Sequence, residues 1–202
     1  MKIAILGAGN IGGTLGKKWL ASGREVVFGV RDANSPKTLQ ALEAAKGAVV
    51  TSIAEAITVA EIILFSTPWA TVPEIASANA KGLNGKIILD ATNNFAGPVI
   101  NNLSALEKAA PSAKIYRAFN SLGWELFANP MVGSERVDMF YSGPDGETKS
   151  MVEKLINEVG VRPVWVGDNT QITLVDNLGA LWVNLVFHQG WKRHTALKII
   201  SD

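Results

Sequence analysis

The chain reads Gly7-Ala8-Gly9-Asn10-Ile11-Gly12 close to its beginning, and this stretch decides the fold. A nearly uncharged segment, Met1–Leu6, comes directly before it, and the helix-patterned residues 13–22 follow. A bare G-x-G-x-x-G is common by chance, but between a strand and a helix it is typical of a dinucleotide-binding turn.

Each glycine of this turn has a separate physical task. Gly7 permits the tight turn, Gly9 lets the backbone approach a pyrophosphate, and Gly12 lets the helix pack on the strand. The helix that begins near Asn10 and Ile11 offers unpaired N–H groups and the positive end of its dipole to that phosphate. We therefore expect residues 7–12 to bind the pyrophosphate of a dinucleotide.

Strands and helices alternate along the next hundred residues. Two capping boxes, Ser52-x-x-Glu55 and Ser104-x-x-Glu107, mark expected helix starts. The predicted strands are 1–6, 25–29, 49–50, 61–66, 86–90 and 114–119, and the other predicted helices are 35–45, 68–80 and 104–110. Six parallel strands with intervening helices predict a doubly wound α/β sheet, the Rossmann fold, in the order 3-2-1-4-5-6.

The remaining residues are expected to extend the same domain. Residues 1–121 form the predicted Rossmann dinucleotide-binding core, and residues 122–202 the predicted extension that completes the sheet and an acceptor pocket. The expected elements of this extension are strands at 137–142 and 161–166, a helix at 146–159 and a long closing helix at 170–190.

Composition narrows the classes of function. The chain has 202 residues, 19 basic and 18 acidic side chains and no cysteine. The balanced charge argues against a nucleic-acid partner, and the lack of cysteine excludes disulfides, thiolate nucleophiles and Cys-based metal sites. No apolar run reaches the roughly 20 residues of a membrane helix. We expect no metal, no membrane partner and a cytoplasmic location.

The end of the second strand, Phe28-Gly29-Val30-Arg31-Asp32, bears on the choice of nucleotide. NAD-binding folds usually place a carboxylate there for the ribose hydroxyls, and Asp32 stands near that position. Arg31 comes first, however, and its guanidinium can form charge-assisted bonds with a 2′-phosphate. Ser35 and Lys37 follow within a few residues and can add to the same contact. We therefore predict NADP, held here by Val30, Arg31, Ser35 and Lys37.

Four segments together resemble the NADPH-dependent reductases of the deazaflavin coenzyme F-420, the coenzyme F-420:NADP oxidoreductases. They are the Gly-x-Gly-Asn-x-Gly turn, Phe28-Gly-x-Arg31, Ser66-Thr-Pro-Trp69 and Ala118-Phe-Asn-Ser121. The first two also occur in other NADP folds, including the N-terminal domains of eukaryotic metalloreductases, and the later two discriminate more. The C-terminal portion also looks like that of the family, so the resemblance covers nearly the whole chain.

Two positions depart from the family pattern. Family members commonly have a small hydroxyl residue where this chain has Val30, and archaeal members have a histidine at the position of Asn120, beside the deazaflavin. Asparagine can hydrogen-bond there but cannot deliver a proton near neutral pH. The resemblance thus implies NADP use more firmly than deazaflavin use.

Ligands in such sheets bind beyond the carboxyl ends of the strands. This rule places Ser66, Thr67, Pro68 and Trp69 over the nicotinamide half of NADP. It places Thr92, Asn93 and Asn120 around the acceptor, where we predict that they orient the reacting rings as the catalytic residues, and Thr92 and Asn93 are also expected to contact the cofactor. Hydride transfer between two cofactors needs little more than positioning from the protein.

The closing helix offers several interpretations. Its aromatic residues Trp182, Phe187 and Trp191 suit the cover of an acceptor pocket, a homodimer interface or simple core packing. The Lys192-Arg193-His194 cluster suits an anionic acceptor tail or a solvated helix end. Both histidines of the chain, His188 and His194, are expected to be structural or at the surface.

Three functions remain open from the sequence. The first is an NADP(H)-dependent oxidoreductase that exchanges a hydride with coenzyme F-420, and the second is an NADPH-dependent reductase of another flavin-like, carbonyl or imine acceptor. The third is a non-catalytic NADP(H) sensor. The polar residues 91–94 favour an enzyme, because a sensor needs no acceptor pocket.

Overall fold

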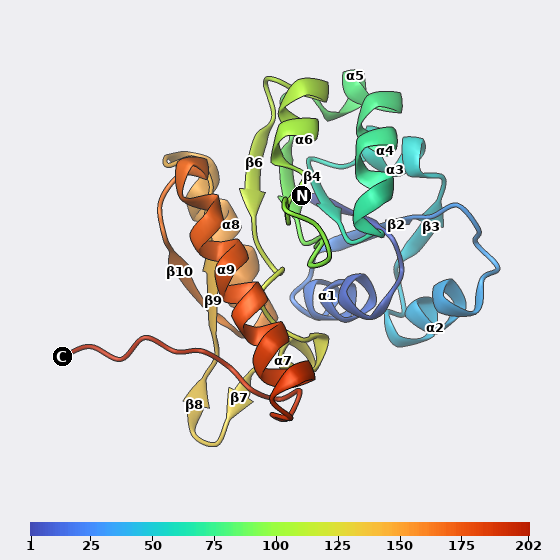
Figure 1. Cartoon of the computed structure of the whole chain (residues 1–202). Coiled ribbons are helices and arrows are strands. Elements are labelled where there is room, and N and C mark those ends of the chain that lie inside the picture. Colours follow the sequence, from blue (N-terminus) through green and yellow to red (C-terminus); the bar gives the residue numbers. More distant parts are fainter.

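A computed structural model describes all residues, 1–202, and its centre is one six-stranded parallel sheet (Figure 1). The strand order is β3-β2-β1-β4-β5-β6, which confirms the predicted doubly wound topology. The strands are β1 (Lys2–Leu6), β2 (Glu25–Gly29), β3 (Val49–Thr51), β4 (Ile62–Phe65), β5 (Ile87–Asp90) and β6 (Lys114–Arg117).

Helices cover both faces of this sheet. They are α1 (Asn10–Ala21), α2 (Pro36–Ala44), α3 (Ile53–Val59), the 3-10 turn η1 (Trp69–Thr71), α4 (Val72–Ala78), α5 (Ala80–Leu83) and α6 (Leu103–Ala109). One hydrophobic cluster holds Leu15 of α1 and Ala41 of α2, and a second holds Ala56 of α3 and Leu106 of α6. Apolar residues on both faces of β1 and β4 feed these two clusters, as expected for buried parallel strands.

Local capping signals explain where two helices begin. Ser35 accepts a hydrogen bond from the Thr38 N–H at the start of α2, and Ser52 and Glu55 form the predicted capping box of α3. The second capping box, Ser104-x-x-Glu107, was a wrong prediction. The helix α6 begins at Leu103, one residue earlier, because the Asn101 side chain accepts from the Leu103 N–H at 2.9 Å.

The C-terminal residues build elements beside the β6 edge (Figure 1). They are α7 (Trp124–Ala128), β7 (Met131–Val132), β8 (Glu135–Arg136), β9 (Asp138–Tyr141), α8 (Glu147–Val159), β10 (Arg162–Trp165), the 3-10 turn η2 (Asn169–Gln171), α9 (Ile172–Val183) and the π-helix η3 (Asn184–His188). The predicted closing helix thus consists of three successive helical types, and α7 and the β7–β8 hairpin were not predicted.

The extra strands do not complete the main sheet, contrary to expectation. The strands β9 and β10 pair with each other in parallel as a separate sheet, and β7 and β8 form another. A single antiparallel bridge, Arg117 to Ser142, joins β9's end to the main sheet. Pairing goes no further because β6 ends at Arg117 and the chain turns away at Phe119, whose φ is +62°.

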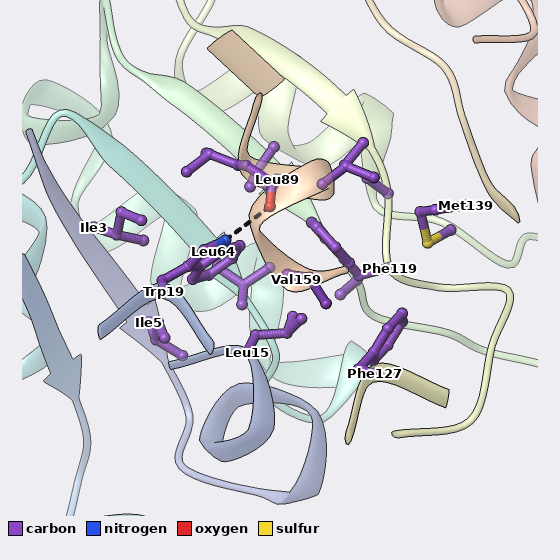
Figure 2. Packing of buried hydrophobic residues seen from close by; sticks show 14 of the residues in the cluster. Ile3, Ile5, Leu15, Trp19, Leu64, Leu89, Phe119, Phe127, Met139 and Val159 are labelled. Atoms are coloured by element: carbon purple, nitrogen blue, oxygen red, sulfur yellow. Dashed lines mark hydrogen bonds between the residues drawn. The ribbon is translucent and has the colours of Figure 1, made fainter. Parts of the chain in front are cut away.

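The two parts of the chain share one core (Figure 2). The larger cluster joins Trp19 of α1 to Phe127, Met139 and Val159 of the C-terminal elements. Trp19 is fully buried and its indole N–H donates to the Leu155 carbonyl of α8 at 3.0 Å. Large aromatic burial of this kind ties α8 to the nucleotide-binding half. None of the helices has the length and apolarity needed to cross a bilayer.

Candidate functional site at the carboxyl edge of the sheet

The glycine turn between β1 and α1 has the backbone that its sequence predicts. Gly7 has φ +99°, a left-handed conformation that only glycine adopts freely. A Cβ on Gly12 would lie 2.2 Å from the Gly7 carbonyl oxygen and 2.9 Å from Ile5, so only glycine lets α1 pack this closely. The Ser66 hydroxyl donates to the Leu6 and Gly7 carbonyls, each at 3.0 Å, and thereby fixes the turn to β4.

Gly9 differs from the other two glycines. It has an ordinary extended φ of −77°, and a Cβ there would meet no protein atom within 4 Å. Protein packing therefore does not require glycine at this position. Gly9 is also the N-cap of α1, makes no side-chain cap, and precedes a first turn with no acidic residue. Such a helix start leaves N–H groups free for an anion.

The end of β2 carries an unneutralised cation. Arg31 is exposed and forms no hydrogen bond or ion pair with the rest of the chain. The Asp32 carboxylate instead accepts from the Asn34 N–H at 2.8 Å, within its own turn. Ser35 uses its hydroxyl to cap α2, whereas Lys37 is exposed and unpaired, and Val30 is half-buried. Of the residues predicted for a 2′-phosphate, Arg31 and Lys37 are thus free to bind one.

The segment after β4 forms hydrogen bonds with the glycine turn and with the loop before α6. Ser66 supports the glycine turn, and the Trp69 indole N–H donates to the Asn101 carbonyl at 3.1 Å. Pro68 is exposed at the surface. Thr67 differs from its neighbours because its hydroxyl is buried without any partner in the chain. Trp69 therefore has a packing contact, and Thr67 has unused hydrogen-bonding capacity.

The loop after β5 is a closed hydrogen-bond network. The Thr92 hydroxyl donates to the Asp90 carboxylate at 2.6 Å and accepts from the Asn102 side chain at 3.1 Å. The Asn93 side chain donates to the Asn120 carbonyl at 2.8 Å and accepts from Arg117 at 2.6 Å. The side chains of Thr92 and Asn93 thus form hydrogen bonds within the protein, and Asn93 holds the Asn120 backbone; that they contact the reacting rings stays a prediction.

Arg117 organises this network, although the sequence did not single it out. Its side chain is fully buried and pairs with Asp90 at 3.2 Å and with Asp176 of α9 at 2.8 Å. The same guanidinium donates to the Thr92 carbonyl and to Asn93. The ends of β5 and β6 are thereby joined to α9. A signal for it existed in the sequence, because Arg117 is a charge between the apolar residues Tyr116 and Ala118, and the predicted pairing of β5 and β6 brings it near Asp90.

The residues after β6 carry the least satisfied polar groups of the site. Phe119 has φ +62°, and such strain in a residue with a side chain tends to occur at functional sites. Asn120 and Ser121 follow, 4% and 3% exposed, and neither the Asn120 amide nor the Ser121 hydroxyl has a partner in the chain. Buried polar groups without partners are rare and costly in folded proteins.

A cleft of about 440 Å³ lies beside the glycine turn. Predicted residues Gly9, Asn10, Ile11 and Ser66 form one side of it. The other side comes from later elements. The sequence had offered Trp182, Phe187 and Arg193 for the acceptor as one of several interpretations. The sequence had not indicated the other lining residues, which are Phe95, Leu122, Gly123, Trp124 and Val183. Its outer wall includes the π-helix η3, a distortion that is frequent at functional sites.

Arg193 covers the aromatic wall of the cleft. Its guanidinium lies 5.2 Å from the Phe187 ring centre and 5.5 Å from that of Trp182. It also forms an ion pair with Glu125. Burial would raise the pKa of Glu125, but the hydrogen bond and charge of Arg193 lower this pKa below its ordinary value. His194 contacts the Asn129 carbonyl, so only Arg193 of the basic cluster reaches the cleft.

The sequence of residues 2–94 matches the family described as NADP oxidoreductase, coenzyme F-420-dependent. A protein from Arthrobacter sp. FB24, provisionally assigned as an F-420-dependent NADP reductase, has a similar structure with a TM-score of 0.86. It is 26% identical, and the similarity covers the whole of both chains.

Two further relatives share part of this chain's features. The rat (Rattus norvegicus) metalloreductase STEAP3 is 29% identical over 171 residues, which is 82% of this chain and 34% of STEAP3. The chain thus spans about a third of the length of that relative. A reductive aminase from Aspergillus terreus, solved with NADPH and ethyl-5-oxohexanoate, is 22% identical with a TM-score of 0.64 over 95% of this chain and 68% of its own, and shares the fold.

These matches agree with the glycine turn, the free Arg31 and the strand order. The family and the Arthrobacter protein are described as NADP oxidoreductase and NADP reductase, and STEAP3 as a metalloreductase. The resemblance that the sequence motifs predicted is thereby confirmed: residues 2–94 match the family of coenzyme F-420-dependent NADP oxidoreductases, and the whole chain is similar to a protein assigned as an F-420-dependent NADP reductase.

Proposed function

We propose that the protein transfers a hydride between NADP(H) and the deazaflavin coenzyme F-420. The observation that carries the proposal is the group of buried, unpartnered polar atoms after β4 and β6: the Thr67 hydroxyl, the Asn120 amide and the Ser121 hydroxyl. These atoms stand at the carboxyl edge of the sheet, where such folds bind the nicotinamide. A ligand that hydrogen-bonds them would remove the cost of burying them.

The chemistry of Asn120 suits the carboxamide of nicotinamide. An asparagine side chain offers two N–H donors and one carbonyl acceptor, and a carboxamide offers the complementary set. The Asn93 side chain donates a hydrogen bond to the backbone carbonyl of Asn120. The side chain of Asn120 stays free for a ligand. We therefore assign Asn120 to nicotinamide orientation and Thr92 and Asn93 to its support.

Gly9 and Arg31 support the binding of NADP at the other end of the site. The open space around Gly9 suits a pyrophosphate that approaches the backbone at the start of α1. The unpaired guanidinium of Arg31 suits a 2′-phosphate. When NADPH is bound, its nicotinamide supplies the hydride and becomes oxidised, and the acceptor gains this hydride together with a proton from solvent.

The side chains of the cleft favour a flat ring acceptor over a carbonyl or imine. The unpartnered polar groups after β4 and β6 lie outside the lining of the cleft, and they are hydroxyls and an amide, which do not give up protons near neutral pH. Phe187 and Trp182 supply aromatic surface for stacking. The resemblance puts a histidine at the position of Asn120 in archaeal members, so reduction of another flavin-like acceptor is the second candidate, and NADP(H) sensing without turnover is the third.

An absorbance assay of NADPH oxidation separates these functions. Purified protein is offered the deazaflavin, FMN and a small carbonyl compound in turn. The proposal predicts rapid oxidation with the deazaflavin alone, and an Asn120→Ala variant with kcat lowered about 10- to 100-fold, as for loss of an orienting contact. The matched control is Asn129→Ala, an exposed asparagine that follows α7 and whose side chain forms no hydrogen bond within the chain. Oxidation with FMN alone would favour the second candidate, and binding without oxidation the third.

We also propose a homodimer formed through α9. Leu174 and Leu181 are 51% and 43% exposed and lie seven residues apart, on one face of the helix. An exposed apolar stripe of this kind suits a second copy of the same helix across a twofold axis. Light scattering should give twice the chain mass, and Leu181→Glu should give the monomer mass. A cytoplasmic location and the lack of a nucleic-acid partner stay predictions.

A further inference from the structure

Three buried charged side chains join the ends of β5 and β6 to α9. The Arg117 guanidinium pairs with Asp90 at 3.2 Å and with Asp176 at 2.8 Å, and all three residues are buried. We call these three residues the Arg117 cluster. Two carboxylates share one guanidinium, so the Arg117 cluster carries one negative charge in excess.

The excess charge has no counter-ion in the chain. The remaining hydrogen bonds of Asp90 come from uncharged donors, namely the N–H and hydroxyl of Thr92 and the N–H of Asn102. The second oxygen of Asp176 accepts from the Asn101 side chain at 2.7 Å. Burying an unbalanced charge is costly even when it is hydrogen-bonded. This arrangement therefore suits a site that receives a cation.

The Arg117 cluster lies next to the residue that we assign to the nicotinamide. Arg117 donates to the Asn93 side chain at 2.6 Å, and Asn93 donates to the Asn120 carbonyl at 2.8 Å. On the other side, a Cβ on Gly179 of α9 would lie 3.3 Å from the same carbonyl oxygen. Asp176 is also buried and lies three residues earlier, about 4.5 Å along the helix axis. A ring held by Asn120 is therefore within the field of the excess charge.

The cleft itself adds no charge that opposes this field. Arg193 is the one charged residue of the cleft lining, and its ion pair with Glu125 is neutral as a whole. A nicotinamide ring carries one positive charge when it is oxidised and none when it is reduced. A fixed negative charge nearby lowers the energy of the oxidised ring relative to that of the reduced ring.

We infer that the excess negative charge of the Arg117 cluster favours the oxidised form of the bound nicotinamide and thereby assists the loss of a hydride from NADPH. The hydride and its electron pair pass to the acceptor, the ring keeps one positive charge, and a proton from solvent completes the reduced acceptor. Asp90 and Asp176 act on the ring at a distance, through their charge. This inference rests on the proposed function, because it takes Asn120 as the nicotinamide contact.

Equilibrium titration with NADP⁺, NADPH and 2′-phospho-ADP-ribose tests the inference. The third ligand keeps the phosphates but lacks the nicotinamide. In Asp176→Asn the side chain keeps its shape and an acceptor for Arg117, which stays paired with Asp90. The ratio of the Kd of NADP⁺ to the Kd of NADPH should rise about three- to tenfold, because only the oxidised ring loses an attraction. The Kd of 2′-phospho-ADP-ribose should not change.

A second variant and two controls separate charge from structure. Asp90→Asn removes the same excess charge from the other side of Arg117 and should also raise the ratio, which keeps the test decisive if Asp176→Asn does not fold. Asn101→Ala removes a contact of Asp176 but no charge. Glu147→Gln removes an exposed, unpaired carboxylate at the start of α8. Both controls should leave the ratio unchanged.

Three results would overturn the inference. The first is an unchanged or lowered ratio in whichever of the two aspartate variants folds. The second is an equal rise in Asn101→Ala, which would attribute the effect to a lost contact. The third is an equal weakening of 2′-phospho-ADP-ribose, which would place the effect away from the nicotinamide.

This inference and the proposed function fail in different ways. A raised ratio in Asp176→Asn, without oxidation of NADPH by the deazaflavin, would retain the preference for the oxidised ring and remove the proposed acceptor. Oxidation of NADPH by the deazaflavin with the same ratio in all variants would retain the hydride transfer and remove the role of the Arg117 cluster.

Discussion

Arg31 is the residue on which the choice of nucleotide depends. Its exposed guanidinium has no partner in the chain, whereas Asp32 uses its carboxylate within the turn. Loss of a charge-assisted bond to phosphate costs about 1.5–3 kcal/mol, or roughly 10- to 100-fold in affinity. We expect Arg31→Ala to raise the KM for NADPH by this factor and to change the KM for NADH less than about twofold.

The control for Arg31 is its neighbour. Asp32→Asn keeps an acceptor for the Asn34 N–H and removes the charge. Steady-state kinetics with both nucleotides should leave its NADPH to NADH preference unchanged. A preference for NADH that disappears in Asp32→Asn would instead make Asp32 the ribose ligand and contradict NADP use.

Arg117 was missed as a site residue, because its partners are distant in sequence and its charge within the strand was not singled out. Asp90 lies 27 residues before it and Asp176 lies 59 residues after it. The glycines of the turn are different, since their reasons are local: a positive φ at Gly7 and a close approach at Gly12. Residues with local causes could be read from the sequence, and residues with tertiary causes could not.

We expect Arg117→Ala to destabilise the protein strongly. It would leave the buried carboxylates of Asp90 and Asp176 without their cation, which typically costs about 3–5 kcal/mol. Denaturant unfolding measures this change in free energy. Lys154→Ala, an exposed surface change, should stay within about 0.5 kcal/mol of the unaltered protein. A loss below about 1 kcal/mol for Arg117→Ala would show that the network is solvated.

At the scale of elements, two glycines at the start of α1 have different roles. Gly12 is required for packing of the helix, and Gly9 is proposed for binding of the cofactor. A Cβ on Gly12 would collide with the Gly7 carbonyl, whereas one on Gly9 would meet open space. We expect Gly12→Ala to lower stability by about 1–3 kcal/mol through overpacking. Gly9→Ala should unfold at the same denaturant concentration as the unaltered protein but lose most of its NADPH affinity.

Calorimetric binding of NADPH alongside unfolding distinguishes the two variants. Unweakened NADPH binding by a folded Gly9→Ala protein would contradict the assignment of this turn to the pyrophosphate.

The sequence predicted elements well where periodicity and local caps determine them. The box at Ser52 and Glu55 is present, and α8 spans Glu147–Val159 as expected from its pattern. It failed at α6, whose N-cap Asn102 makes no side-chain cap and where the Asn101 side chain accepts a hydrogen bond from the Leu103 N–H. It also missed the helix α7 and the β7–β8 hairpin, because a helix of five residues and strands of two residues carry too little periodic signal.

At the scale of the whole molecule, carboxylates with lowered pKa values determine how the stability of the fold changes at low pH. Asp138 on β9 is buried and accepts hydrogen bonds from Arg162 and from the Ile199 N–H of the C-terminal segment. Burial would raise the pKa of Asp138, but these hydrogen bonds and the charges of Arg162 and Lys198 lower it below its ordinary 3.8. The pKa values of Glu55 and Glu125 are also lowered from their ordinary 4.5.

A carboxylate whose pKa is lowered by folding stabilises the folded state above the pKa of the unfolded chain. That contribution is lost as the pH falls from the unfolded value through the folded one. We therefore expect the Tm to fall as the pH drops below 4.5, and steeply below 3.8. Asp138→Asn should make this fall shallower in thermal unfolding at several pH values, and an unchanged slope would contradict the role of Asp138.

The arrangement of the whole chain could be predicted only in part. Six strands and their order followed from the alternation of patterns, but the separate β9–β10 sheet did not, because sequence does not reveal where pairing with β6 stops.

Transfer of deuterium from NADPH labelled at the reacting nicotinamide carbon tests the central claim most directly. If the cleft holds the nicotinamide against the deazaflavin ring, mass spectrometry should find one deuterium in the reduced deazaflavin, from one of the two labelled epimers of NADPH only. Oxidation of NADPH with the deuterium released to solvent, or tight NADPH binding with no transfer to the deazaflavin, would contradict hydride transfer at this site.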